Sequence, residues 1–414
     1  MTIKSTKTIG AIYFAALILI FIVIEYNRTG DFFVYLQAAS DLFGSENIFK
    51  KLYGNPPSLF YFGNPFLTTL LYPFSLLPIR IAALVWKLIN LIALFRIFQL
   101  IDNRIFKPFL KKNQNVSAIV VLYVGSFFWV YSNFHLQQLT IIILFLCLEA
   151  LNQIFYQNRK WFGGILLGLA LCIKITPIVF LPYLLYKLQW RSFISSIAII
   201  VFAVLLPSLF LGWNSNLEIW DNWLGALAVD DPNWAIFDMN NRKNHGIAAW
   251  LSTLFIADIQ DNVVSLTHRR YLIDLGQGTV KYLIYLIRVA LVIFTLYFLK
   301  NRKRSIEPLK LFWEWSYLFL VIPLFFPQQR LYNFIFLLPA FSYLILVQVQ
   351  QYQTTKINWK TILFSISILV FNLELLIGFF RKHLWYHKSA TYATIILLIL
   401  LSCQVPRRSY SDLK

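Results

Sequence analysis

Long runs of apolar residues, separated by short polar segments, make up most of this chain. A helix that crosses the hydrocarbon core of a bilayer needs about 20 predominantly apolar residues, and many of the runs approach that length. We therefore predict an all-α polytopic membrane protein, a bundle of about twelve transmembrane helices. The predicted spans cover residues 9–26, 80–101, 116–131, 139–156, 161–173, 175–188, 193–211, 279–299, 309–326, 331–349, 361–380 and 389–402.

Two longer polar segments interrupt this pattern, at residues 27–79 and 212–278, and we expect both to lie outside the membrane as external loops of one integral domain over residues 1–414. The apolar run at 66–77 in the first loop is too short to cross comfortably and contains Pro73, so it predicts an interfacial helix. The first apolar run has no small-residue cleavage site after it, and we interpret it as a retained helix.

A second helix is predicted directly after Asp31, where the first span has ended. Apolar residues follow at the i, i+3, i+4 spacing of a helix with one apolar face: Phe32, Tyr35, Leu36, Ala39, Leu42 and Phe43. Asp31 is then the N-cap or first residue of that helix, beside Gly30. Two interpretations stay open: the carboxylate only caps the helix, or it is a chemical group placed at the membrane surface.

Composition supports the membrane class, because 59% of the residues are hydrophobic and only 13% are charged. The mean hydropathy of +0.64 excludes a water-soluble globule. A net charge of +19 suggests nucleic acid in a soluble protein, but here the cations flank the apolar spans as the positive-inside rule describes. We predict no nucleic-acid partner, and both termini in the cytoplasm. The three cysteines lie in apolar runs and indicate neither a disulfide framework nor a metal site.

Polar and ionisable residues gather on the predicted outer face, where they are costly and are candidates for function. The candidates are Asp31, Asn133, His135, Gln137, Gln138, Lys174, Asn240, Asn241, Arg242, Lys243, Asn244, His245, Gln328, Gln329, Arg330 and Tyr332. Each has an ordinary alternative, since lysine and arginine snorkel to headgroups and a histidine can bond to a loop. Together, one carboxylate with cations and amides suits a general base beside a phosphate-binding rim.

These segments resemble a known family of membrane enzymes. Gly30-Asp31-Phe32-Phe33-Val34-Tyr35, followed by Phe60-Tyr61, resembles the first external loop of GT-C glycosyltransferases, and most closely that of glycosyltransferase family 87. The run that ends in Lys174-Ile175-Thr176-Pro177 is similar to that family's Gly-Leu-Ala…Lys-x-x-Pro stretch, and Asn244-His245-Gly246 is similar to its Asn-x-Ser/Gly element. Two positions depart from the pattern: Leu136-Gln137-Gln138-Leu139-Thr140 replaces a Gly-Gln-x-Asn element, and Gln328 or Gln329 stands at the usual histidine.

The resemblance implies a GT-C-type bundle and an inverting, metal-independent and cofactor-free transfer of one sugar. The donor is a polyprenyl-phosphate sugar, mannose or another hexose or pentose. The acceptor is a glycolipid or glycan on the external, periplasmic face of a bacterial inner membrane. Asp31 is the implied general base, and Lys174, Arg330 and His245 stabilise the departing phosphate. The other implied substrate-binding residues are Asn244, His135, Gln137, Gln138, Gln329 and Tyr61.

Several alternatives remain at this point. The tryptophans Trp213, Trp220, Trp223 and Trp234 either stack on sugar rings or form an interfacial belt. Asp230-Asp231 is interpreted as a loop pair, because no ligand-spaced His or Glu accompanies it. A transporter or flippase for a lipid-linked glycan also places polar groups among many spans, although it predicts internal repeats that we do not find. A non-catalytic relative of the same fold is the other alternative.

Overall fold

The computed structural model describes residues 6–44, 47–227, 243–257, 271–300, 307–351, 358–376, 378 and 381–406. Asp230-Asp231, Trp234 and residues 240–242, which the sequence brought forward, lie outside the described residues. The chain divides into two compact units. The N-terminal unit contains Lys7–Leu100 and Tyr131–Asp230, and the C-terminal unit contains Met1–Thr6, Ile101–Val130 and Asp231–Lys414. One integral domain over the whole chain stays a prediction.

The described residues are almost entirely helical, as the apolar runs predict. The elements of the N-terminal unit are α1 (Thr6–Ile18), η1 (Leu19–Ile24), α2 (Phe32–Ser40), η2 (Asp41–Phe43), β1 (Leu52–Tyr53), β2 (Leu59–Phe60), α3 (Pro65–Ser75), α4 (Ile79–Ile101), α6 (Thr140–Leu151), η4 (Asn152–Tyr156), α7 (Lys160–Ile173), η5 (Thr176–Val179), α8 (Phe180–Tyr186), α9 (Trp190–Leu205), α10 (Ser208–Leu211) and α11 (Trp213–Leu227). Helix α5 (Lys112–Leu136) begins in the C-terminal unit and ends in the N-terminal one. The C-terminal unit adds η3 (Asp102–Phe106), α13 (Ile247–Phe255), α14 (Gly276–Leu299), α15 (Pro308–Phe325), η6 (Leu331–Leu337), α16 (Leu338–Gln351), α17 (Trp359–Leu376), α18 (Arg381–Tyr386) and α19 (Ser389–Ser402).

Seven helical segments of the described chain are long and apolar enough to cross a membrane. They are Thr6–Ile24, Ile79–Phe106, Lys112–Leu136, Trp190–Leu211, Gly276–Leu299, Pro308–Phe325 and Leu331–Gln351. Each coincides with a predicted span. The other predicted spans correspond to shorter apolar helices, and their crossing of the membrane stays a prediction.

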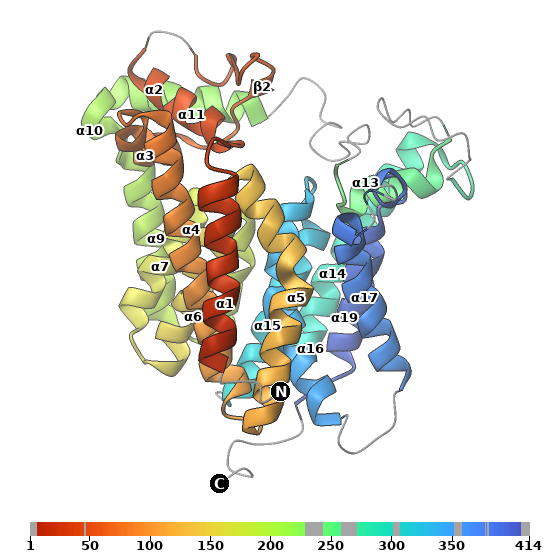
Figure 1. Cartoon of the computed structure of the whole chain (residues 1–414). Coiled ribbons are helices and arrows are strands. Elements are labelled where there is room, and N and C mark those ends of the chain that lie inside the picture. Colours follow the sequence, from red (N-terminus) through yellow and green to blue (C-terminus); the bar gives the residue numbers. More distant parts are fainter. Residues whose placement is uncertain are drawn as a thin grey trace. The chain divides into compact units, whose positions relative to one another are not determined.

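In the N-terminal unit, α2, the β1–β2 hairpin and α11 lie together beyond one end of the long helices (Figure 1). The two strands pair antiparallel, with Leu52 opposite Phe60 and Tyr53 opposite Leu59. Helix α2 is buried more completely than its sequence predicts. Val34 and Ala38, outside the predicted apolar face, pack into a cluster that α11 also contacts. The structure therefore fixes α2 from two sides.

The polar break that the sequence predicts at Lys174 is confirmed. Helix α7 ends at Ile173, Lys174 is extended, and the 3₁₀ turn η5 starts α8. Proline at the start of η5 explains the break, because it lacks the N–H that would continue the α7 ladder.

In the C-terminal unit, α15 is the central helix. In its apolar window 83% of the residues are buried, compared with 17% in α14 and 11% in the first helix of the chain. Indole and phenol groups tie α15 and α16 to the end of α19. Trp313 Nε1 donates to the Leu401 carbonyl at 2.9 Å, and Tyr343 Oη donates to the Gln404 carbonyl at 2.6 Å. The helices with exposed apolar residues are those that suit lipid contact.

Candidate active site

Asp31 occupies the N-cap position of α2, but its carboxylate is not used as a cap. Among the described residues no backbone N–H of α2 bonds to that side chain. Oδ2 of Asp31 instead accepts a hydrogen bond of 2.5 Å from Nε2 of Gln138, a residue 107 positions away in the sequence. Gln138 is almost completely buried. The carboxylate therefore makes no capping bond to α2, and its chemical role stays a prediction.

The backbone before Asp31 is docked on the end of α5. The Asp31 N–H donates to the Leu136 carbonyl at 2.9 Å. Gly30 has a φ of +52°, and a Cβ there would lie 2.5 Å from the Leu136 carbonyl carbon and oxygen. Only glycine tolerates both the left-handed backbone and this close approach. Gly30 therefore determines where the carboxylate of Asp31 points.

Hydrogen bonds in both directions join the segment before Asp31 to the end of α5. Arg28 Nε donates to the His135 carbonyl at 3.0 Å, and Gln137 Nε2 donates to the Arg28 carbonyl. Trp86 Nε1 of α4 donates to the Gln137 carbonyl at 3.2 Å. Gln137 has a φ of +51°, a conformation that is costly for residues other than glycine and is concentrated at functional sites. We call Asp31, Gln137, Gln138 and these partners the Asp31 junction.

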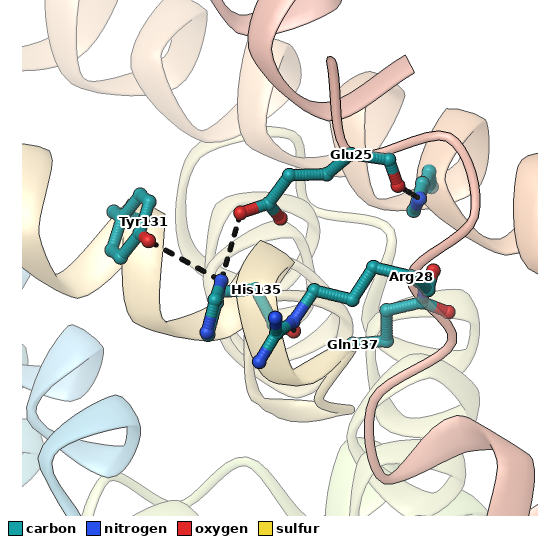
Figure 2. A network of polar contacts seen from close by, with 6 residues as sticks. Glu25, Arg28, Tyr131, His135 and Gln137 are labelled. Carbon is teal, nitrogen blue, oxygen red and sulfur yellow. Dashed lines mark hydrogen bonds and ion pairs between the residues drawn. The ribbon is translucent and has the colours of Figure 1, made fainter. Parts of the chain in front are cut away.

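His135 belongs to the same junction and carries an acidic partner (Figure 2). Its Nδ1 lies 2.8 Å from Glu25 Oε1 and 3.3 Å from the hydroxyl of Tyr131, whose ring stacks on the imidazole. The Glu25 carbonyl in turn accepts a 2.7 Å hydrogen bond from Nζ of Lys87. The side chains of Glu25 and Tyr131 therefore orient the imidazole.

Asn64 links the segment before Lys174 to the loop of residues 27–79. The side chain of Asn64 caps α3 by accepting from the Leu67 N–H at 2.9 Å, and its Nδ2 donates to the Cys172 carbonyl at 2.7 Å. This bond joins the start of α3 to the end of α7, two residues before Lys174. Because α2 packs on α3, the loops of Asp31 and Lys174 belong to one assembly.

Tyr61 is fully buried under α2, where it packs with Tyr35 and Phe49. Its hydroxyl accepts a hydrogen bond of 3.0 Å from Thr68, and burial raises the pKa of this phenol. A ring in this position supports the helix that begins at Asp31. Direct contact between Tyr61 and a sugar stays a prediction.

A second junction of distant loops occurs in the C-terminal unit. The His245 N–H donates to the Gln329 carbonyl at 2.7 Å, and the Gln329 N–H donates to Oδ1 of Asn244 at 3.0 Å. Asn244 Nδ2 also donates to the Pro327 carbonyl at 3.1 Å. A Cβ on Gly246 would lie 2.6 Å from that same carbonyl oxygen, so the segment needs glycine there. We call Asn244, His245, Gln329 and Arg330 the His245 junction.

The imidazole of His245 is almost completely buried, and neither ring nitrogen has a hydrogen-bond partner among the described residues. Burial, together with the buried ammonium of Lys388, holds the pKa of His245 well below its usual value. The ring is therefore neutral at pH 7. The side-chain oxygen Oε1 of Gln329 is likewise buried without a partner in the described structure. Buried polar atoms are costly when they lack a partner, so these atoms have capacity for further hydrogen bonds.

Arg330 follows Gln329 and is half-buried at the start of η6. Its carbonyl accepts from the Asn333 N–H, while its guanidinium has no hydrogen bond or ion pair among the described residues. Its five donors are thus available for an anion.

Sequence reasoning missed the residues that hold these groups. Glu25, Arg28 and Trp86 were not candidates. Glu25 and Arg28 are ionisable residues at the end of the first span, and this position could have marked them as candidates. Lys388, which directly precedes the predicted span 389–402, was not a candidate either. The structure buries it completely beside His245, and Thr391 Oγ1 donates to the His245 carbonyl at 2.6 Å.

Comparison with protein families matches residues 61–327 to glycosyltransferase family 87. The matched region is well over half of the chain and includes Gln138, Lys174 and His245. The chain belongs to glycosyltransferase family 87. Arg330 lies three residues after the matched region of this family member, and Asp31 lies 30 residues before it.

Individual relatives are similar over shorter stretches. The family member is 26% identical over 188 residues to the polyprenol-phosphate-mannose-dependent alpha-(1-2)-phosphatidylinositol pentamannoside mannosyltransferase of Mycolicibacterium smegmatis, covering 44% of this chain and 43% of that protein. It is 32% identical over 111 residues to the polyprenol-phosphate-mannose-dependent alpha-(1-2)-phosphatidylinositol mannoside mannosyltransferase of Mycobacterium tuberculosis, covering 25% of each. The matches span less than half the length of these relatives.

Proposed function

We propose that this protein is a membrane glycosyltransferase that moves one sugar from a polyprenyl-phosphate donor to a glycolipid or glycan acceptor on the external face of the membrane. The observation that carries the proposal is the carboxylate of Asp31, which occupies a helix N-cap position but is bonded to the buried amide of Gln138 instead of to the helix. Family membership and the donors named for the relatives support the choice of substrate class.

In the proposed reaction Asp31 is the general base. Its carboxylate takes the proton of an acceptor hydroxyl while that oxygen attacks the anomeric carbon of the donor. The bond from this carbon to the phosphate oxygen breaks, and its electron pair leaves with the polyprenyl phosphate. One displacement of this kind inverts the anomeric configuration. A placed base of this type contributes about 10²–10⁴-fold in rate.

The other residues divide between orientation of the base and binding of phosphate. Gln138 positions Asp31. Gln137, His135 and Tyr61 hold the surrounding loops in place, and we assign these three residues an indirect part in substrate binding, through the loop geometry that they maintain. Lys174 and Arg330 supply positive charge to the leaving phosphate, where charge grows in the transition state.

His245 and its neighbours make a different contribution. Because the ring is neutral, we assign His245 to hydrogen bonding with the donor and not to charge neutralisation. Its unpaired nitrogens and the Oε1 of Gln329 give the His245 junction both donor and acceptor capacity. Asn244 fixes this loop by its three bonds. We assign neither a metal ion nor a cofactor to the reaction.

The test is sugar transfer in proteoliposomes with radiolabelled polyprenyl-phosphate mannose, a crude lipid-linked acceptor and a chelator. Asp31→Asn keeps the size of the side chain and removes the base, so transfer should fall by about 10²–10⁴-fold. Asp41→Asn is the matched control. Asp41 lies at the other end of α2, where η2 begins, and pairs with Lys51 at 2.8 Å near solvent. It should transfer sugar like the wild type.

Each other result has a definite meaning. Transfer that survives Asp31→Asn moves the base to another residue. If the wild type transfers none of the lipid-phosphate sugars tried, the enzyme class is wrong and the transporter interpretation gains. Equal loss in the Asp41→Asn control attributes the effect to the loop's stability and not to chemistry.

A further inference from the structure

A pocket of about 370 Å³ lies at the end of the N-terminal unit remote from Asp31. It is lined by Asn158, Arg159, Lys160, Trp161, Phe162 and Arg191. The helical segment Thr140–Tyr156 separates Gln138 from this pocket, a length of roughly 25 Å at about 1.5 Å per residue. In Figure 1 α2 lies at the upper end of the unit and the turn between α6 and α7 at its lower end. The pocket is therefore not part of the Asp31 junction.

Close packing of α7 on α9 builds the pocket. A Cβ on Gly164 would lie 1.9 Å from Oγ of Ser195, so the helices approach to backbone contact at this level. Ser192 Oγ donates to the Lys160 carbonyl at 2.8 Å. The first turns of both helices consequently lie side by side, and Arg191 of α9 faces the same pocket as Lys160 of α7.

The turn before α7 completes the wall. The Arg159 N–H donates to the Gln153 carbonyl at 2.8 Å, which folds the chain back at the end of η4. Asn158 takes up the left-handed backbone needed for this reversal, with a φ of +55°. Three cationic side chains from two segments thus line one cavity.

The charge of this cavity is not balanced within the described structure. Arg159, Lys160 and Arg191 have no side-chain hydrogen bond or ion pair among the described residues. Neither α7 nor α9 carries an acidic residue in its first turn. Cations at helix N-termini oppose the helix dipole, and three together repel one another. A bound anion removes both costs.

The rim of the pocket is aromatic and exposed. Trp161 is 53% exposed, Phe162 47% and Trp190, beside Arg191, 55%. Tryptophans at this level of a membrane helix sit among headgroups, with their rings against the upper acyl chains. A site for a free anion needs no such rim, whereas a lipid headgroup brings its apolar chains with it.

We propose that this pocket binds the phosphate headgroup of an anionic phospholipid in the membrane leaflet opposite to Asp31. Arg159, Lys160 and Arg191 contact the phosphate, and Trp161 and Phe162 pack on its acyl chains. Basic pockets between membrane helices recognise acidic lipids through this combination of charge and apolar contact. The proposal is independent of the sugar-transfer activity.

The test is a lipid titration of the purified full-length protein in a non-ionic detergent, followed by native mass spectrometry. The probes are phosphatidylglycerol, phosphatidylcholine and inorganic phosphate. Wild type should retain phosphatidylglycerol in preference to phosphatidylcholine. The double variant Arg159→Gln/Arg191→Gln should bind phosphatidylglycerol roughly tenfold to thirtyfold more weakly, as expected for two charges near a headgroup. Lys111→Gln/Lys112→Gln removes two exposed cations elsewhere and should bind it like the wild type.

Two further variants keep the test informative if the double variant is unstable. Arg191→Gln alone should show a smaller loss, and Arg159→Lys/Arg191→Lys should retain most of the binding because the charge remains. Equal retention of phosphatidylglycerol by wild type and the glutamine variants overturns the proposal. So does inorganic phosphate that displaces the lipid at equal concentration, since the site is then one for a free anion.

Discussion

The Asp31 junction and the His245 junction are built in the same way but present different chemical groups. In each, a short loop is bonded to a loop about a hundred positions away in the sequence, through backbone carbonyls and amide side chains. In each, a glycine permits a backbone approach that a Cβ would prevent. The shared construction shows how the connecting segments of a helical membrane protein can hold polar side chains in fixed positions by hydrogen bonds.

The difference lies in what remains unpaired. The carboxylate of Asp31 is already oriented by the amide of Gln138. The imidazole of His245 is buried, neutral and without a hydrogen-bond partner in the described structure. The first junction suits proton abstraction, and the second suits hydrogen bonding to a ligand that arrives with its own polar atoms. Four predictions test this distinction.

Of these four changes, Gly30→Ala should have the largest effect on sugar transfer. The new Cβ meets the Leu136 backbone and opposes a φ of +52°, so the loop must move and Asp31 with it. A displacement of about 1 Å at a reacting group can cost about 10²-fold in rate. Gly225→Ala is the control, because a Cβ there meets no atom within 4 Å. Proteoliposome transfer measures both, and a fully active Gly30→Ala variant contradicts the proposed docking.

Arg330→Gln should reduce transfer by roughly tenfold, seen mainly as a higher KM for the donor. The guanidinium is proposed to bond the donor phosphate, and a hydrogen bond to a charged group contributes about 1.5–3 kcal/mol. Arg330→Lys keeps the charge without the planar pair of donors, so its KM for the donor should lie between that of the wild type and that of Arg330→Gln. An unchanged KM in both variants removes Arg330 from the phosphate site.

Gln138→Leu should lower kcat several-fold with little change in KM. The leucine fills the buried space but cannot donate to Asp31 Oδ2, so the carboxylate loses its orientation and not its charge. Gln138→Asn, with a shorter amide, should recover part of the activity only if it reaches the carboxylate. A loss confined to KM would assign Gln138 to direct substrate contact instead.

The smallest effect concerns the pH dependence of stability at His245. The pKa of this residue is lowered in the folded state, while in the unfolded chain it is about 6.5. As the pH falls below that value, the unfolded chain binds a proton that the folded protein refuses. The free energy of unfolding of the wild type therefore falls by up to about 1.4 kcal/mol per pH unit in this range, and that of His245→Gln lacks this decrease. Thermal unfolding between pH 7.5 and 5.5 measures the two slopes, and parallel slopes contradict a neutral, buried imidazole.

The sequence by itself determined the membrane class, the positions of the longest helices and the helix that starts at Asp31. These follow from local properties: apolar run length, the period of apolar residues, and proline at Pro177 that breaks the chain after Lys174. It also placed Asp31, Gln137, Gln138 and the members of the His245 junction on predicted outer loops. The order of the spans along the chain sets the side of the membrane on which each loop is predicted, and loops on the same side can contact one another.

Only the tertiary structure decided which of these residues touch. The bond from Gln138 to Asp31 joins segments 107 residues apart, and no periodicity records such a pair. The full burial of Tyr61 depends on the neighbouring β1–β2 hairpin and on α11, whose residues come from a distant part of the chain. The basic pocket depends on Gly164, which lets α7 approach α9. Local sequence sets the shape of an element, but contact between elements is set by close packing, which only the folded chain defines.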